Sequence, residues 1–313
     1  MDPGYRGALK PTGGSSAWHK RRPLELRETL VSYAFLLPAL AFFGVFVVYP
    51  ILVGVFTSFF DYTMRKFDFV GLDNYIRLFG DKIFLKSMKN TILLVAGAVP
   101  MVVIFSVFIS STIYQKSPLV RSLFRGVFYL PVVTGTVSVT VVWKWIFDPF
   151  SGVLNWVLQS AGLTDQPIMW LGDRRYALWA ILAVLFTTSI GQPVVLYTAA
   201  LGNLDKSQIE AAEIDGASDW QVFRYVKWPG MMPTTLYVAV ITTINSFQCF
   251  SLIQLLTSGG PNYNTSTVMY LLYERAFKLM QFGYANAMGV VLAVVIGIIS
   301  ILQFRVFGSN VEY

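Results

Sequence analysis

The sequence predicts an all-α, polytopic membrane helix bundle with six transmembrane helices. Of the 313 residues, 55% are apolar and 13% are charged, and the mean hydropathy is +0.58. An ordinary soluble domain is about 45–50% apolar and about 25% charged. A soluble chain of this length could not cover so much apolar surface in one core. The composition therefore excludes a soluble globular protein, a disordered chain and a collagen-like fibre.

Six stretches have the roughly 20 mostly apolar residues that a helix needs to cross a bilayer. Glycine, proline and charged residues separate them, as in the Ser-Gly-Gly-Pro sequence after the fifth stretch. We therefore expect a six-span domain over residues 30–308, between a basic tail at 1–29 and a short C-terminal tail at 309–313. The predicted spans are Tyr33–Phe60, Thr91–Tyr114, Val127–Phe147, Ala177–Leu201, Thr235–Thr257 and Ala285–Phe307.

The first predicted span is about twice as long as the apolar core of a signal peptide and has no small-residue cleavage site, so we expect it to be retained. The basic tail before it predicts a cytoplasmic N-terminus, and six spans then place the C-terminus in the cytoplasm as well. The formal charge of +7 is consistent with this topology and with contact to anionic lipid. No basic cluster is interleaved with aromatic residues, so we expect no nucleic-acid binding.

The predicted spans contain few of the ionisable side chains that proton transport or catalysis within the membrane would need. The 17 Asp and Glu residues all fall outside the six predicted spans, which argues against a proton-driven carrier. The sequence has one cysteine, Cys249, and one histidine, His19. We therefore expect no internal disulfide, no multi-cysteine metal site and no catalytic residue.

Polar residues are concentrated in the fifth predicted span. Thr242, Thr243, Asn245, Ser246 and Gln248 fall within seven residues. A polar stripe of this density is typical of a helix face that lines a wet cavity, although such groups also bond to backbone or to a neighbouring helix. We expect this face to line a polar pathway.

The segment 204–233, between the fourth and fifth predicted spans, is too charged to cross a membrane. Ser207 and Glu210 have the spacing of a capping box, Gly216 is suited to end the helix that follows, and Ser218 or Asp219 can cap a second helix. This predicts a rigid helix–glycine–helix projection on the cytoplasmic face. An amphipathic connector lying on the lipid headgroups explains the same local signals equally well.

The residues of this segment carry a family resemblance. Glu210, Ala211 and Ala212, then Asp215, Gly216 and Ala217, with Phe223, Pro229 and Pro233, resemble the EAA loop of binding-protein-dependent ABC importer permeases. The type is that of the maltose and glycerol-phosphate permeases. Residues 69–79, 252–267 and 282–289 are similar to further ordered pieces of that family, so that the resemblance covers about residues 30–308.

The resemblance implies that the projection is a coupling helix that docks into a cytoplasmic ATPase subunit. The sequence has no G-x-x-x-x-G-K-[ST] motif, so ATP and Mg²⁺ would be bound by the partner ATPase and no cofactor by this chain. The residues implied in coupling are Glu210, Ala211, Ala212, Asp215, Gly216, Ala217, Phe223 and Pro229.

The resemblance also implies a sugar pathway through the third, fourth and fifth predicted spans. A tyrosine near Val132 and an asparagine near Cys249, which the maltose subunit has, are missing here. The sugar therefore stays open among malto-, galacto- and uronic-acid oligosaccharides and glycerol phosphate. The positions implied in the pathway are Val132, Thr136, Gly191, Gln192, Thr242, Asn245, Ser246, Cys249 and Ser251.

The implied assembly joins this chain to a second related permease, two ABC ATPase subunits and an extracytoplasmic binding protein, in a bacterial cytoplasmic (inner) membrane. The sequence fits two other classes of protein less well. A solitary channel or carrier would show buried acids or internal repeats, and neither is present. A membrane-embedded enzyme would need paired acids, a metal set or a nucleophile with its base. The candidate residues lie in one external loop, and helix capping and solvation explain them better: Asp148, Asp165, Asp173, Arg174 and Arg175.

Overall fold

A computed structural model describes the backbone of residues 22–308 and the side chains of residues 29–306. His19, most of the predicted basic tail and the predicted C-terminal tail lie outside the described residues. The chain divides after Gly54 into two units. The first unit contains α1 (Arg22–Phe43), the π-helical turn η1 (Gly44–Val48) and the start of α2 (Tyr49–Thr57). The helical stretch Thr29–Thr57, with a mean hydropathy of 2.5, matches the predicted first span.

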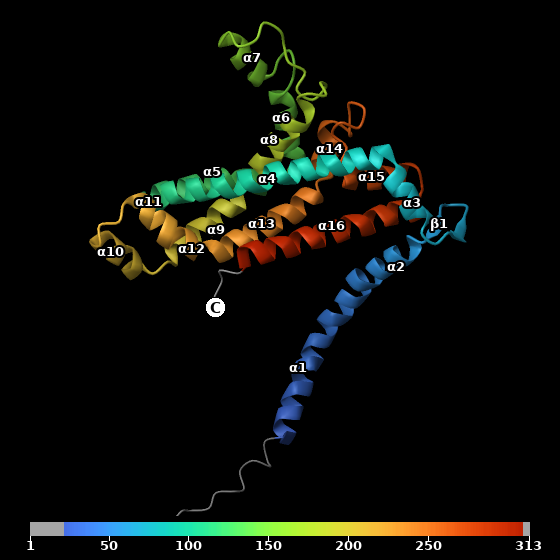
Figure 1. The fold of residues 1–313 in the computed structure, drawn as a ribbon, viewed down its shortest axis with the longest axis horizontal. Helices are drawn as coiled ribbons and strands as arrows, with labels where there is room; N and C mark the ends of the chain where they lie inside the picture. The colour runs from blue at the N-terminus through green and yellow to red at the C-terminus, as the bar shows by residue number, and fades with distance from the viewer. Residues whose placement is uncertain (1–21, 309–313) are drawn as a thin grey trace, which may run out of the picture. The chain divides into compact units, whose positions relative to one another are not determined.

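The second unit is a bundle of long helices (Figure 1). Its centre is α4 (Lys82–Tyr114), which packs against α9 (Gly191–Gly202) and α13 (Met232–Phe247), while α13 packs against α16 (Phe282–Gly308). The apolar residues of these helices form buried clusters, one of them around Val102, Tyr197 and Met231. The remaining helices of the bundle are α5 (Pro118–Thr134), α6 (Thr136–Ile146), α8 (Ala177–Ser189), α12 (Trp228–Gly230), α14 (Ser251–Leu256) and α15 (Val268–Tyr273).

Shorter elements lie at the ends of the bundle. A hairpin of β1 (Phe60–Tyr62) and β2 (Phe67–Phe69), paired with Phe60 opposite Phe69, was not expected from the sequence. At the opposite end from this hairpin lies α10, and α7 is carried on α6 away from the bundle (Figure 1). The other short elements are α3 (Asp73–Gly80), α7 (Val153–Ser160), α10 (Lys206–Ile214), α11 (Asp219–Val222), η2 (Phe223–Lys227) and η3 (Glu274–Lys278).

The fold is mostly helical, as predicted, but the predicted spans are not all single straight helices. Among the described residues, 3 helices have the length and hydropathy to cross a bilayer, and up to 5 segments do so if each bent pair is one span. The predicted third span bends by 103° between α5 and α6, where Gly135 has a φ of +83°. The fourth bends by 43° between α8 and α9, and the fifth is divided between α13 and α14.

Buried hydrogen bonds fix the end of the bundle at which α4 begins. The Asn90 side-chain amide donates to the Tyr263 and Ser266 carbonyl oxygens, at 3.1 and 3.0 Å, and the Thr91 hydroxyl accepts from the Val268 amide at 3.0 Å. Because these bonds satisfy backbone groups of the loop between α14 and α15, they hold that loop on α4.

The contact between the hairpin and α16 generates a prediction. A side chain at Gly283 would place its Cβ against the Phe60 carbonyl oxygen and 2.9 Å from the Tyr62 nitrogen. We expect Gly283→Ala to lower the thermal unfolding midpoint of the detergent-solubilised protein, since overpacking costs about 1–3 kcal/mol. Gly297→Ala is the control, because a Cβ added at Gly297 in the same helix would have no heavy atom of another described element within 4 Å. Equal unfolding midpoints for the two variants would show that the hairpin does not pack closely against α16 at Gly283.

Candidate functional site

Three interruptions of the long helices bring polar side chains together inside the bundle. They lie at Gly135, between α5 and α6, at Ile190, between α8 and α9, and at residues 248–250, between α13 and α14. Residues on both sides of each interruption line two neighbouring cavities. Broken helices at membrane depth are tolerated where they line a cavity, since water or ligand can satisfy the freed backbone groups.

Each of the two cavities has a volume of about 190 Å³. Asn245 and Thr188 line both, so these two residues lie at the junction between the cavities. Of the pathway positions predicted from the sequence, the first cavity is lined by Val132, Gln192, Thr242 and Asn245, and the second by Thr136, Asn245, Cys249 and Ser251.

Two predicted pathway positions lie elsewhere. Ser246 is 1% exposed and lines neither cavity, and its hydroxyl has no hydrogen-bond partner among the described residues. Gly191 is also buried, at the contact of α9 with α5, where a Cβ would meet the Phe128 carbonyl oxygen and lie 3.0 Å from Val132. Gly191 therefore lets α5 approach α9, and its neighbour Gln192 is the residue that reaches the cavity.

Gln248, which the sequence placed in the polar stripe of the fifth span, lines the second cavity, as that stripe predicted. Three further polar lining residues of the first cavity were not among the predicted pathway positions: Thr188, Ser189 and Tyr237. Thr188 precedes Gln192 by four residues, a spacing that places two residues on one helix face, so the sequence contained a signal for it. Tyr237 lies in α13 two turns before Asn245, and its aromatic ring made it an ordinary apolar member of the predicted span.

The cavities are polar without being charged. None of the described residues that line them is Asp, Glu, Lys, Arg or His. The side-chain amides of Gln192, Asn245 and Gln248 are all on exposed residues and make no hydrogen bond with the rest of the described chain. Each amide offers both donors and acceptors. The cavities are therefore suited to a hydroxyl-rich, uncharged ligand.

The segment 204–233 folds into the predicted helix–glycine–helix projection. The capping box expected of Ser207 and Glu210 is wrong, because Asp205 is the N-cap of α10 and accepts from the Ser207 amide at 2.9 Å. Hydrogen bonds from the Ser207 hydroxyl and amide lower the pKa of the Asp205 carboxyl. Asp205 precedes the first helical residue, Lys206, as a cap must, whereas Ser207 already lies within the helix.

The turn of the projection is built as predicted. Gly216 has a φ of +80°, and the Ala217 amide donates to the Ala212 carbonyl oxygen at 3.0 Å, which closes the end of α10. Ser218 then caps α11 in a capping box with Gln221, which confirms one of the two predicted caps. Pro229 and Pro233 lie in the first turns of α12 and α13.

The projection is attached firmly to the bundle. Phe223 has ring contacts with Trp220 and Trp228, at centroid distances of 5.6 and 6.4 Å. Leu204, Phe223 and Trp228 pack against the cluster that contains Tyr197. Glu210, Ala211 and Asp215 are exposed at the tip, while Ala212 and Ala217 are partly covered. A force on the tip would therefore reach α13 and α9 through packed aromatic contacts.

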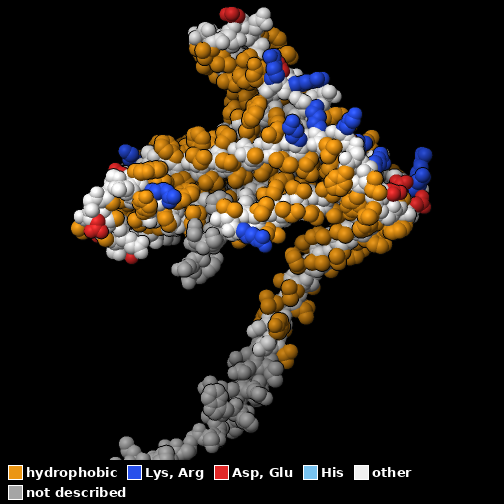
Figure 2. Space-filling view, in the orientation of Figure 1, with side chains coloured by type: hydrophobic (Ala, Val, Ile, Leu, Met, Phe, Trp, Pro, Cys, Tyr) orange, Lys and Arg blue, Asp and Glu red, His pale blue; other side chains and the backbone are white. Residues whose placement is uncertain are grey.

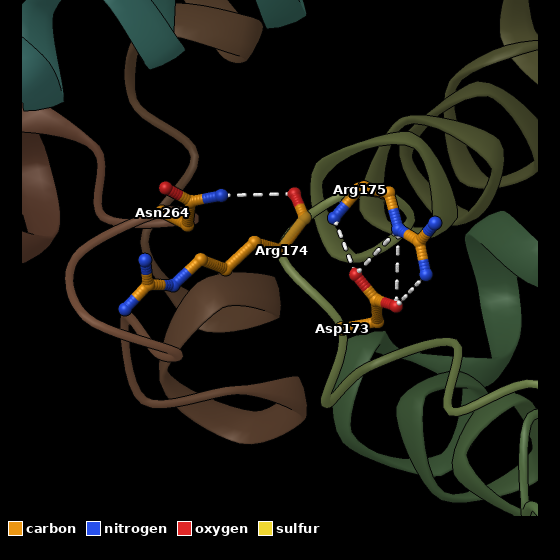
Figure 3. A network of polar contacts seen from close by, with 4 residues as sticks. All are labelled: Asp173, Arg174, Arg175 and Asn264. Carbon is orange, nitrogen blue, oxygen red and sulfur yellow. Dashed lines mark hydrogen bonds and ion pairs between the residues drawn. The ribbon is translucent and has the colours of Figure 1, made fainter.

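The loop acids that an enzyme site would require form local contacts instead. Asp173 forms an ion pair with Arg175 at 2.9 Å, and the Asn264 side chain donates to the Arg174 carbonyl oxygen at 2.8 Å (Figure 3). Asp148 accepts from the amide and the hydroxyl of Ser151 and from the Phe150 amide, and these hydrogen bonds lower the pKa of its carboxyl. Among the described residues, no group of three or more His, Cys, Asp or Glu could hold a metal ion.

Comparison with known proteins places the chain in a family. Residues 91–312 match the family described as the binding-protein-dependent transport system inner membrane component. The lactose transport system permease protein of Rhizobium radiobacter is 30% identical, over 87% of this chain and 92% of that protein. The diacetylchitobiose uptake system permease protein of Streptomyces coelicolor is 33% identical, over 92% of this chain and 85% of that protein.

A solved structure shares the fold. A chain of a bacterial ABC transporter that imports the acidic polysaccharide alginate superposes with a TM-score of 0.79 at 23% identity, covering 94% of this chain and 100% of that one. The match of the family model and the two relatives agree with the multi-pass helical architecture. The chain is an integral membrane, non-catalytic permease component and belongs to the family of binding-protein-dependent ABC transport system inner membrane components.

Proposed function

We propose that this chain forms half of the translocation pathway of an ATP-driven importer for an uncharged oligosaccharide. The observation that carries the proposal is the pair of uncharged, amide-lined cavities that meet at Asn245. The names of two relatives, which refer to lactose and diacetylchitobiose, support a sugar as the substrate. Sugars are bound through directed hydrogen bonds to their hydroxyls, which Gln192, Asn245 and Gln248 can supply.

The proposal includes the domain organisation and topology expected from the sequence. Six spans over residues 30–308 would place both termini in the cytoplasm of a bacterial cell, with the two bent pairs and the α13–α14 pair each counted as one span. The projection 204–233 would then face the cytoplasm. The 1–29 and 309–313 tails would lie on the same side.

The chain would work with a second related permease, two ABC ATPase subunits and an extracytoplasmic binding protein. ATP and Mg²⁺ would be bound by the ATPase subunits. Closure of these subunits would push the projection, and its packed contacts to α9 and α13 would carry the movement to the cavities. A pull-down of the tagged chain from native membranes in mild detergent, followed by mass spectrometry, tests the assembly. Recovery of the chain without an ATPase, in a detergent that preserves a known importer, would contradict it.

Asn245 provides the test of the pathway. We expect Asn245→Leu to lower the rate of sugar uptake about 2- to 12-fold, because one neutral hydrogen bond contributes about 0.5–1.5 kcal/mol. Assembly of the complex should be unchanged, since the Asn245 side chain is exposed and makes no hydrogen bond within the described chain. Ser246→Ala is the matched control, because Ser246 faces away from both cavities and should leave uptake unchanged. Normal uptake of every candidate sugar by Asn245→Leu would remove Asn245 from the pathway.

Gly216 provides the test of coupling. Proline fixes φ near −65°, which is incompatible with the φ of +80° at Gly216. We expect Gly216→Pro to abolish ATP-driven uptake while the chain is still inserted, as measured by sugar accumulation and by the amount of chain in the membrane.

Gly162→Pro is the matched control for this variant, because Gly162 follows α7 with a φ of +67° and lies outside the projection. Equal loss of uptake in both variants would attribute the effect to general misfolding. Normal uptake by Gly216→Pro would exclude a role for this turn in coupling.

A further inference from the structure

A groove on the side of the bundle is unused by the proposed pathway. It lies between the last turns of α4 and the second half of the projection, and its volume is about 870 Å³. One wall is the α4 face that carries Val103, Ile104, Val107 and Phe108, of which Ile104 is 64% and Phe108 68% exposed. The apolar surface of the chain is extensive on the view of Figure 2, as a lipid-facing protein requires.

The length of the apolar wall matches one leaflet of a bilayer. The nine residue steps from Val103 to Thr112 correspond to a rise of about 14 Å along a helix. Half of the hydrocarbon core of a bilayer is about 15 Å thick. Lys116 is one further turn along the chain, where the headgroup layer would begin if the projection faces the cytoplasm.

The rim of the groove is basic and aromatic. Lys116 and Arg224 both line it and form no ion pair with a carboxylate in the described part of the chain. One acid, Asp219, lies on the same rim, so two cations face one anion. Trp220 and Trp228 line the projection side, and tryptophan is enriched at the level of lipid headgroups.

We propose that this groove binds an anionic phospholipid of the cytoplasmic leaflet. One acyl chain would lie along Val103–Phe108, and the phosphate would be held between Lys116 and Arg224. The proposal rests on the proposed function for its orientation, because it requires the projection to face the cytoplasm. The bound lipid would fill the space between α4 and the projection and so stiffen the joint through which coupling passes.

Photolabelling of the intact importer complex tests the site. The complex is placed in vesicles of phosphatidylcholine that contain a trace of phosphatidylglycerol with a photoreactive acyl chain, and labelled peptides are identified by mass spectrometry. We expect a label on residues 103–112. The double variant Lys116→Gln and Arg224→Gln should need about 30-fold more phosphatidylglycerol for the same labelling, since each cation near a membrane surface contributes about 1 kcal/mol.

The matched control removes two cations from elsewhere. Arg65→Gln with Lys66→Gln changes the charge equally in the turn of the β1–β2 hairpin and should leave the labelling unchanged. If the double variant at Lys116 and Arg224 does not assemble, Ile104→Trp is the alternative. Its larger side chain would partly fill the groove without a change of charge, and it should reduce the label on residues 103–112.

Three outcomes would overturn the site. Photoreactive phosphatidylcholine that labels residues 103–112 as strongly as phosphatidylglycerol would show general contact with lipid only. Unchanged labelling of both groove variants would exclude the groove. Disulfide cross-linking of Phe108→Cys to a cysteine in the related permease would show that a protein helix fills it. Sugar uptake and recovery of the ATPase are measured on the same preparations. These two measurements test the proposed function independently of the lipid site.

Discussion

The need to satisfy backbone polar groups within a membrane constrains this structure more than any single side chain. A helix in lipid can be interrupted only where the freed amides and carbonyls face protein, water or ligand. The interruptions at Gly135, at Ile190 and after Phe247 fall beside the same two cavities. The cavities therefore lie where they do because the helices are interrupted there. Asn245, at their junction, is presented by the helix that stops two residues later.

Apolar packing connects the base of the projection to the helices that line the cavities. Gly216 gives the projection its bend, whereas Leu204, Phe223 and Trp228 hold its base on the cluster around Tyr197. Close-packed interiors transmit displacement because they have little free volume. The exposed tip is thus available for contact with a partner, while the packed base connects the projection to the bundle.

Local signals predicted the parts of the chain whose conformation is decided locally. The left-handed turn at Gly216 and the cap at Ser218 are encoded within a few residues, and both are present. Apolar length predicted the helices at Thr29–Thr57, α4 and α16. The 103° bend at Gly135 was missed because apolar composition does not distinguish a straight span from a broken one. The side that Ser246 faces was missed for a related reason, since the polar residues of α13 cover more than one face.

The unbonded amides of the cavities bear on how long a substrate stays. The side-chain amides of Gln192, Asn245 and Gln248 have no hydrogen-bond partner among the described residues, and all three residues are exposed, so in the absence of sugar we expect these amides to bond to solvent. Sugar hydroxyls then replace water one for one, and the net gain in free energy of each exchange is small. If the proposed function holds, the binding protein provides the tight binding of the sugar. The cavities of this chain then bind the sugar weakly, which favours rapid transport. Release toward the cytoplasm then needs only the opening of the pathway, because no strong ion pair has to be broken within it.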